Sequence, residues 1–202
     1  MRWYATIIKT PMSLKWKTYY EQTEHAPPSP LLVSALPYVE HRGKAIDIGG
    51  GALKDTRYLL AQGFDVTVLD KEESLAEMAD AIGNHRLHAV VTSFDEYAFP
   101  QQAFDLASAM FSLPFNPPHT FEQVFSSIKD SLVQGGIFCG QFFGDRDEWA
   151  SNTDMTFHAK EEIERLLSDL QVIELDEREY RANLASGLPK HWHLFQVIAR
   201  KR

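Results

Sequence analysis

The chain has 202 residues, of which 44% are apolar and 24% charged, as is ordinary for a soluble globular protein. Its net charge of −8 argues against a nucleic-acid partner, which needs a basic face, and its single cysteine, Cys139, excludes an internal disulfide. The N-terminal region mixes basic and aromatic residues, and no apolar run reaches 18 residues, so we expect no signal peptide, no membrane contact and a cytosolic location.

Residues 1–43 form an aromatic-rich N-terminal segment. Ser29 followed by Pro30 predicts the start of a helix, because a hydroxyl can cap free N–H groups and proline suits the first helical position. Pro37 is expected to disturb that helix. We find no repeat and no break in composition, so residues 1–202 are predicted to form a single domain whose core is 44–202.

From Lys44 onward, strand and helix signals alternate. Strands are predicted at 44–48, 65–69, 87–91, 104–109, 137–143, 172–180 and 193–200. Helices are predicted at 53–62, 72–82, 121–132 and 160–170. This alternation predicts a doubly wound α/β fold, with a seven-stranded, mostly parallel sheet and helices on both faces. No helical pattern joins the last two strands, so we expect them to form an antiparallel hairpin.

A glycine turn follows the first predicted strand, at Gly49, Gly50 and Gly51. Glycines at such a turn let the backbone approach a ligand closely, and the helix that follows supplies free N–H donors. Asp70 closes the next strand about twenty residues later, where a carboxylate can accept both hydroxyls of a ribose. The two features together indicate a nucleoside-binding edge far more specifically than either does alone.

These residues resemble the class I S-adenosylmethionine (SAM)-dependent methyltransferases, in particular the small-molecule enzymes similar to those of tellurite resistance and ubiquinone biosynthesis. Asp47 to Gly51 resembles their first motif, and the resemblance implies that Asp47 lies beneath a turn that contacts the methionine part of SAM. It also implies that Asp70 holds the ribose and that Ser93-Phe94 lies beside the adenine. Leu53 departs from the pattern, since it replaces a third glycine, and Ser93 stands where many members have Asp.

Other predicted contacts come from the same edge and from the N-terminal segment. We expect Lys71 and Ala109 to contact the cofactor, and we expect Tyr20 to reach it as part of a lid. The lid is predicted to contain the aromatic and histidine side chains that precede the first strand: Trp16, Tyr19, Tyr20 and His25. Plain packing of a terminal helix explains these aromatics equally well.

Methyl transfer from a sulfonium needs alignment above all, and it needs a base only where the acceptor arrives protonated. An antiparallel last strand begins at the ligand edge, so His191 and His193 are candidate bases; the alternative is that they only cap the strand. Asn116-Pro117-Pro118-His119 suggests an amino-methyltransferase motif, but it comes seven residues late, and we interpret it as a loop. No metal-ligand spacing occurs, so we expect no metal.

The sequence therefore predicts a SAM-dependent methyltransferase acting on a small molecule. Two alternatives stay open. One is a SAM-binding sensor or partner subunit without catalysis. The other is an NAD-dependent oxidoreductase, although the third glycine of its fingerprint is missing after Gly51.

Overall fold

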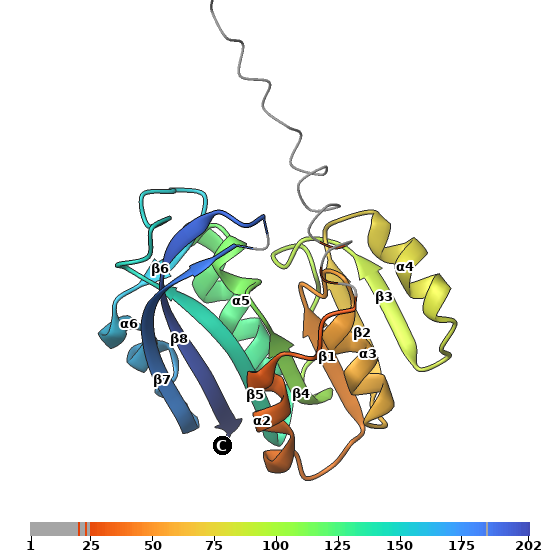
Figure 1. Ribbon diagram of the computed structural model, residues 1–202. Helices are drawn as coiled ribbons and strands as arrows, with labels where there is room; N and C mark the ends of the chain where they lie inside the picture. The colour runs from red at the N-terminus through yellow and green to blue at the C-terminus, as the bar shows by residue number, and fades with distance from the viewer. Residues whose placement is uncertain (1–19, 21–22, 24, 185) are drawn as a thin grey trace, which may run out of the picture.

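A mixed β-sheet runs through the molecule, with helices packed on both of its faces (Figure 1). The computed structural model describes Tyr20, Thr23 and residues 25–184 and 186–202. Within those residues eight strands form the sheet in the order β3-β2-β1-β4-β5-β8-β7, and β6 pairs with β5 outside this path. In the same part of the chain, no helix is long and apolar enough to cross a membrane.

The first five strands are parallel, as the alternation of strand and helix signals predicts. They are β1 (Lys44–Ile48), β2 (Asp65–Asp70), β3 (Leu87–Val91), β4 (Phe104–Ala109) and β5 (Leu132–Gly144). Their carboxyl ends therefore meet at one edge of the sheet, which is where open α/β sheets bind ligands. The turn after β1 and the end of β2 both lie at this edge.

The chain ends in the predicted antiparallel hairpin, formed by β7 (Leu170–Asn183) and β8 (Pro189–Lys201). Strand β8 also runs antiparallel to β5, so its beginning lies at the ligand edge. Side chains alternate across β8 and both faces are covered, which predicts burial of Phe195 on one face and Ile198 on the other. Both side chains are fully buried, and the prediction is confirmed.

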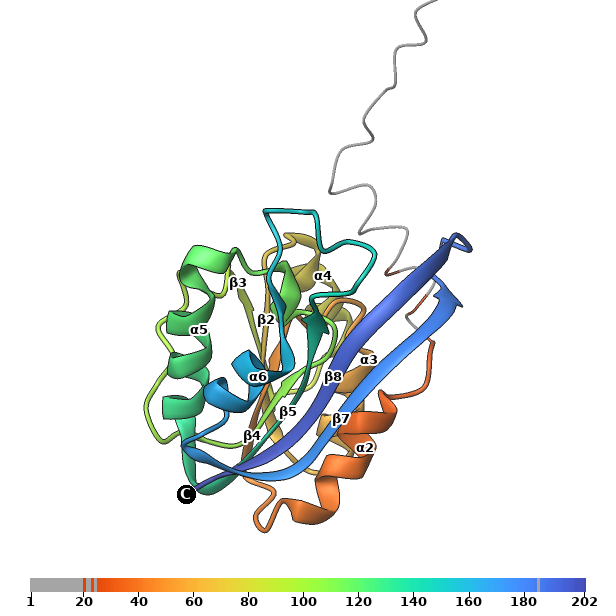
Figure 2. The same ribbon diagram turned by 90° about the vertical axis from the view of Figure 1, so that its left-hand side faces the viewer.

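The helices divide between the two faces of the sheet (Figure 2). One face carries α5 (Pro118–Ser131) and α6 (Lys160–Leu166), which pack on Phe138, Phe142, Phe195 and Val197. The other carries α2 (Pro30–Ala35) and α3 (Lys54–Ala61), which pack on Ile137, Cys139 and Ile198, and next to them α4 (Ser74–Ile82). Burial of two apolar faces is the main force that holds this layered arrangement.

Three local predictions need correction. The hydroxyl of Ser29 does not cap α2, because it donates to the Asp55 carboxylate instead, at 2.6 Å. Helix α6 ends at Leu166 rather than at residue 170, because Leu170 pairs with Lys201 as the first residue of β7. The short strand β6 (Phe157–His158) was not predicted. Pro37 lies within a 3-10 turn (Leu36–Tyr38) that ends the first helix, as expected.

Candidate functional site

The glycine turn after β1 has a geometry that only glycine accepts without strain. Gly49 and Gly51 have φ angles of +76° and +51°, in the left-handed region. The N–H groups of Gly49 and Gly50 both donate to the carbonyl of Leu69 on β2, at 2.7 and 3.1 Å. A methyl group on Gly49 would lie 2.3 Å from Cβ of Ser112, so side chains are excluded there by space as well as by φ.

Leu53, which replaces the third glycine of the family pattern, also adopts a positive φ of +61°. This conformation costs a residue with a side chain roughly 1–2 kcal/mol. The fully buried Leu53 side chain packs with Val68 and Leu75 in a small apolar cluster beneath α4. The substitution therefore keeps the backbone shape of the turn and compensates its strain with apolar packing.

Asp70 lies against the glycine turn, as the spacing predicts. Its Oδ2 accepts from the N–H of Gly51 at 3.0 Å, and its Oδ1 accepts from the N–H of Glu72 at 3.1 Å. The hydroxyl of Tyr20 lies 3.4 and 3.5 Å from the two carboxylate oxygens, a contact at the weak limit of hydrogen bonding. Two backbone donors thus fix the carboxylate, and its remaining lone pairs are held only loosely.

Tyr20 is buried and covers the turn, since its ring would lie 3.3 Å from a methyl group placed on Gly51. The role of Tyr20 as part of a lid stays a prediction. His25 is exposed, and it does not share that position. Trp16 and Tyr19, the other lid residues predicted from sequence, lie outside the described residues.

Asp47 lies beneath the turn, where its buried carboxylate accepts a hydrogen bond from the Thr56 hydroxyl at 2.6 Å. Burial, reinforced by the negative charge of Asp55, raises the pKa of Asp47 to about 7, although Thr56 and Lys54 oppose the shift. The carboxyl group therefore titrates near neutral pH. A cation bound above the turn would favour its charged form.

Ser93 and Phe94 follow β3, at the side of the turn where the adenine is expected. The N–H of Thr92 donates to the carbonyl of Asp70, which brings this segment alongside the end of β2. The Phe94 ring would lie 3.3 Å from a methyl group on Gly49, while the Ser93 hydroxyl donates to Glu96 at 2.9 Å. Lys71, beside Asp70, is exposed.

The chain leaves β4 at Ala109 and makes a strained turn. Phe111 has a φ of +54° and is 36% exposed, and its N–H donates to Oε1 of Gln141 at 3.0 Å. The Ser112 hydroxyl donates to the carbonyl of Ile48 at 2.5 Å, which fastens this turn to the glycine turn. Strained residues of this kind cluster at functional sites. Gln141 was not predicted as a site residue, although a polar residue inside the apolar stretch 137–143 was a usable signal.

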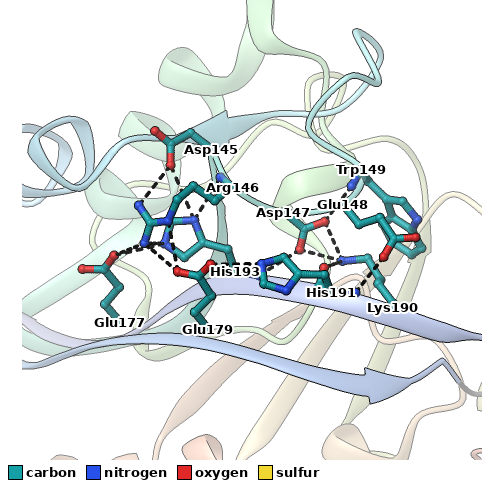
Figure 3. A network of polar contacts seen from close by, with 10 residues as sticks. All are labelled: Asp145, Arg146, Asp147, Glu148, Trp149, Glu177, Glu179, Lys190, His191 and His193. Atoms are coloured by element: carbon teal, nitrogen blue, oxygen red, sulfur yellow. Dashed lines mark hydrogen bonds and ion pairs between the residues drawn. The ribbon is translucent and has the colours of Figure 1, made fainter.

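His191 and His193 lie at the ligand edge, as the antiparallel register predicts, but within a network of polar contacts (Figure 3). His193 is fully buried: its Nδ1 accepts from the N–H of Arg146, and its Nε2 contacts Glu177 at 3.1 Å. Both ring nitrogens are thus engaged, which removes the physical basis for His193 as a base. His191 lies 3.0 Å from Glu179, and its role as a base stays a prediction.

The opposite face of β8 holds a buried ion pair that the sequence analysis did not identify. Lys190 Nζ lies 2.5 and 2.6 Å from the carboxylate oxygens of Asp147, and both side chains are shielded from solvent. The ammonium lies 3.8 Å from the ring centre of Trp192 and 4.3 Å from that of Trp149. Burial lowers the pKa of Lys190, an effect that Asp147 opposes. This arrangement fastens the loop after β5 to the beginning of β8 (Figure 3).

Asn116-Pro117-Pro118-His119 does not lie directly after β4. Asn116 and Pro117 connect a 3-10 turn (Leu113–Phe115) to α5, and Pro118 is the first residue of that helix. The interpretation of this segment as a connection into the helix is confirmed, with the helix starting three residues earlier than predicted.

Comparisons with known proteins agree with this geometry. Residues 45–136 match the family profile described as a methyltransferase domain, and no curated protein matches the sequence. TehB from Haemophilus influenzae has a similar structure, with 17% identity and a TM-score of 0.75 over 93% of this chain and 67% of TehB.

Two further structures share the fold. The first is the 1,6-didemethyltoxoflavin-N1-methyltransferase of Burkholderia thailandensis, solved with 1,6-didemethyltoxoflavin and S-adenosylhomocysteine (20% identity, TM-score 0.69, 94% of this chain and 86% of that chain). The second is a SAM-dependent methyltransferase from Mesorhizobium loti (18% identity, TM-score 0.66, 85% and 96%). At these identities the likeness establishes the fold.

Proposed function

We propose that this chain, whose residues 45–136 match the methyltransferase domain family and whose cofactor is SAM, transfers a methyl group to a small-molecule acceptor. The observation that carries the proposal is the pairing of the glycine turn with the carboxylate of Asp70. A carboxylate held by the backbone N–H of Gly51 is suited to accept the two hydroxyls of a ribose. The whole-chain likeness to solved methyltransferases supports the same function.

The residues at the turn fit the cofactor on the evidence of their own geometry. The turn has no space for a side chain at Gly49, and the positive φ of Gly51 disfavours one there, which keeps the backbone of the turn open to close approach by a ligand. Apart from the two backbone donors, Asp70 has only the long contact with Tyr20 among the residues that the structure describes, so a ribose diol can replace or join that contact. Asp47 adds a carboxyl group beneath the turn, on the side suited to a cation.

In methyl transfer, the main task of these residues is to align the acceptor with the methyl group. SAM, when bound, supplies a methyl group on a sulfonium that is already activated for in-line displacement. Asp70 holds the ribose, Tyr20 covers the turn against water, and the strained turn at Phe111 and Ser112 borders the space between cofactor and acceptor. Such positioning provides most of the acceleration in a reaction of this kind. An acceptor that arrives protonated needs a base, for which His191 is the candidate.

The remaining parts of the proposal follow from composition and topology. The predicted boundary between a lid at 1–43 and a core at 44–202 needs correction, because α2 packs into the core with Ile137, Cys139 and Ile198. We propose that the chain forms a single domain and that the part before α2, which includes Tyr20, serves as the lid. The net charge of −8 favours a small acceptor over a nucleic acid, and a cytosolic location suits the single, buried cysteine.

Calorimetric titration of the full chain with SAM, S-adenosylhomocysteine (SAH) and NAD tests the cofactor. We expect both sulfur-containing nucleosides to bind and NAD not to bind. Binding of NAD alone would favour the oxidoreductase alternative. Turnover of labelled SAM with a panel of small acceptors then separates an enzyme from a SAM-binding protein without catalysis.

A further inference from the structure

A cavity of about 250 Å³ lies between α2 and the C-terminal half of the sheet, beside the strained turn that follows β4. Its lining includes Phe111, Gln141 and Gln196, with Pro30 and Leu31 on the side of α2. For comparison, a cavity of about 150 Å³ in another protein holds benzene. This cavity therefore has room for a substituted ring or two fused rings.

The cavity lies close to the glycine turn that follows β1. Phe111 lines the cavity, and the next residue, Ser112, packs against Gly49 and donates to Ile48. A ligand in the cavity is thus separated from the glycine turn by one strained turn of backbone. A methyl acceptor has to bind next to the cofactor, and this cavity lies next to the glycine turn.

The floor of the cavity offers unused hydrogen-bonding groups. Gln141 and Gln196 are directly opposite each other on β5 and β8. Gln141 is 3% exposed; its Oε1 accepts from Phe111, and its Nε2 has no acceptor within the described part of the chain. The carboxamide of Gln196 has no hydrogen bond at all to the described residues. Both carboxamides line the cavity, so a ligand bound there can accept a hydrogen bond from Nε2 of Gln141.

These groups define the chemistry of a complementary ligand. The Gln141 amide offers a donor, and the neighbouring Gln196 offers a donor and an acceptor side by side. A cyclic amide presents the matching pair, because its carbonyl oxygen accepts and its adjacent N–H donates. Phe111, Pro30 and Leu31 offer apolar contacts that suit the faces of a planar ring. The rest of the lining is polar, with Glu174 and Arg178 of β7 and two serines of the α2 region, so the ring is expected to carry further polar groups.

We propose that this cavity is the acceptor subsite and that it binds a planar ring bearing a lactam-type carbonyl, which accepts a hydrogen bond from Nε2 of Gln141. The proposal rests on the proposed function, since it names the class of molecule that the methyltransferase accepts. Gln141 has two roles: its oxygen holds the strained Phe111 backbone and its nitrogen orients the ligand. Gln196 completes the recognition of the ring edge.

The test uses 2-quinolone, a bicyclic lactam, and quinoline, which has the same ring system without the carbonyl. Saturation-transfer NMR measures the binding of each to the full chain in the presence of SAH, which cannot donate a methyl group. Two variants probe the recognition. Q141E keeps an acceptor for the Phe111 N–H but removes the donor, and Q196L removes a carboxamide that makes no internal hydrogen bond with described residues. Q171L, at an exposed position of β7, is the matched control.

We expect 2-quinolone to bind the wild type and Q171L about tenfold more tightly than quinoline does, and we expect Q141E and Q196L to lose most of that preference. Equal binding of the two compounds, no binding of 2-quinolone at millimolar concentration, or an unchanged preference in both variants would overturn the subsite. SAH affinity, measured in the same samples, distinguishes a failure of the proposed subsite from a failure of the proposed function. If the wild type binds SAH normally while 2-quinolone fails, the cavity assignment alone falls; if SAH fails to bind, the proposed function falls with it.

Discussion

The backbone N–H of Gly51 donates to the Asp70 carboxylate at 3.0 Å, although the two residues are 19 positions apart in the sequence. This hydrogen bond joins the end of β2 to the turn after β1, and it orients the carboxylate toward the space above the turn. The parallel pairing of the two strands makes the contact possible, because Ile48 lies opposite Leu69. The glycine turn and the acid therefore act as one structural unit.

Substitution of Gly49 tests the close packing of that unit. Gly49→Ala introduces a Cβ that lies 2.3 Å from Ser112 and forces a side chain into a positive φ. Gly63→Ala is a matched control, because Gly63 has a φ of +100° with open space around the added methyl group. We expect the control to lose roughly 1–2 kcal/mol of unfolding free energy. Gly49→Ala should lose clearly more and should also bind SAH more weakly. Equal losses in chemical denaturation would contradict the packing argument.

Leu53→Gly separates backbone strain from apolar packing. Relief of the positive φ should return roughly 1–2 kcal/mol, whereas removal of a fully buried leucine costs about 3–5 kcal/mol. We therefore expect a net loss of roughly 1–4 kcal/mol in unfolding free energy, measured by denaturant titration. A variant as stable as the wild type would show that packing with Val68 and Leu75 contributes little.

Asp47 predicts a specific dependence of stability on pH. Its pKa in the folded protein is about 7, above the ordinary value of 3.8, so the folded state binds more protons than the unfolded state between these values. The contribution of Asp47 to the unfolding free energy is consequently highest at low pH, and it falls as the pH rises from about 4 to about 7. Asp47→Asn removes this titration and keeps an acceptor for Thr56.

We expect the stability advantage of Asp47→Asn over the wild type to grow by roughly 2–3 kcal/mol between about pH 5 and about pH 8. Denaturant titrations of both proteins at each pH measure this difference, in which the titrations of other groups cancel. A constant difference across this range would show that the carboxyl group is not perturbed.

The buried ion pair of Lys190 and Asp147 predicts that substitutions of the two residues have strongly coupled effects on the unfolding free energy. Lys190→Met leaves a buried carboxylate without its partner, which costs about 3–5 kcal/mol. Adding Asp147→Asn removes that charge and keeps an oxygen for one of the two N–H groups, those of Trp149 and His193, that donate to Oδ1 and Oδ2 of Asp147. We expect the double variant to be more stable than Lys190→Met alone, by denaturant titration. A second substitution that adds to the loss would show that the two charges are not coupled.

Local sequence patterns were enough to predict the parallel part of the sheet, the C-terminal hairpin and the approach of Asp70 to the glycine turn. Strand and helix periods, glycines at turns and the spacing from Gly49 to Asp70 are properties of short segments, and the parallel topology follows from their order. The same patterns predicted burial of Phe195 and Ile198 on opposite faces, because alternation in a covered strand leaves no other arrangement.

The side-chain network around β8 depends on contacts between distant segments, which such patterns do not contain. Asp147 and Lys190 are 43 positions apart, and nothing near either residue indicates its partner. The register placed His193 correctly at the ligand edge, but its burial depends on Arg146 and Glu177, which come from other segments. Gln141 is the exception, since its polarity inside an apolar strand was visible in the sequence.

The most direct measurement is calorimetric titration of SAH into Asp70→Ala, compared with the wild type and with Asp65→Ala at the exposed start of the same strand. The account predicts that Asp70→Ala folds and binds SAH about ten- to hundredfold more weakly, because charge-assisted hydrogen bonds to the ribose are lost. Asp65→Ala should bind as the wild type does. An unchanged SAH affinity in a folded Asp70→Ala protein would contradict the assignment of this edge as the cofactor site.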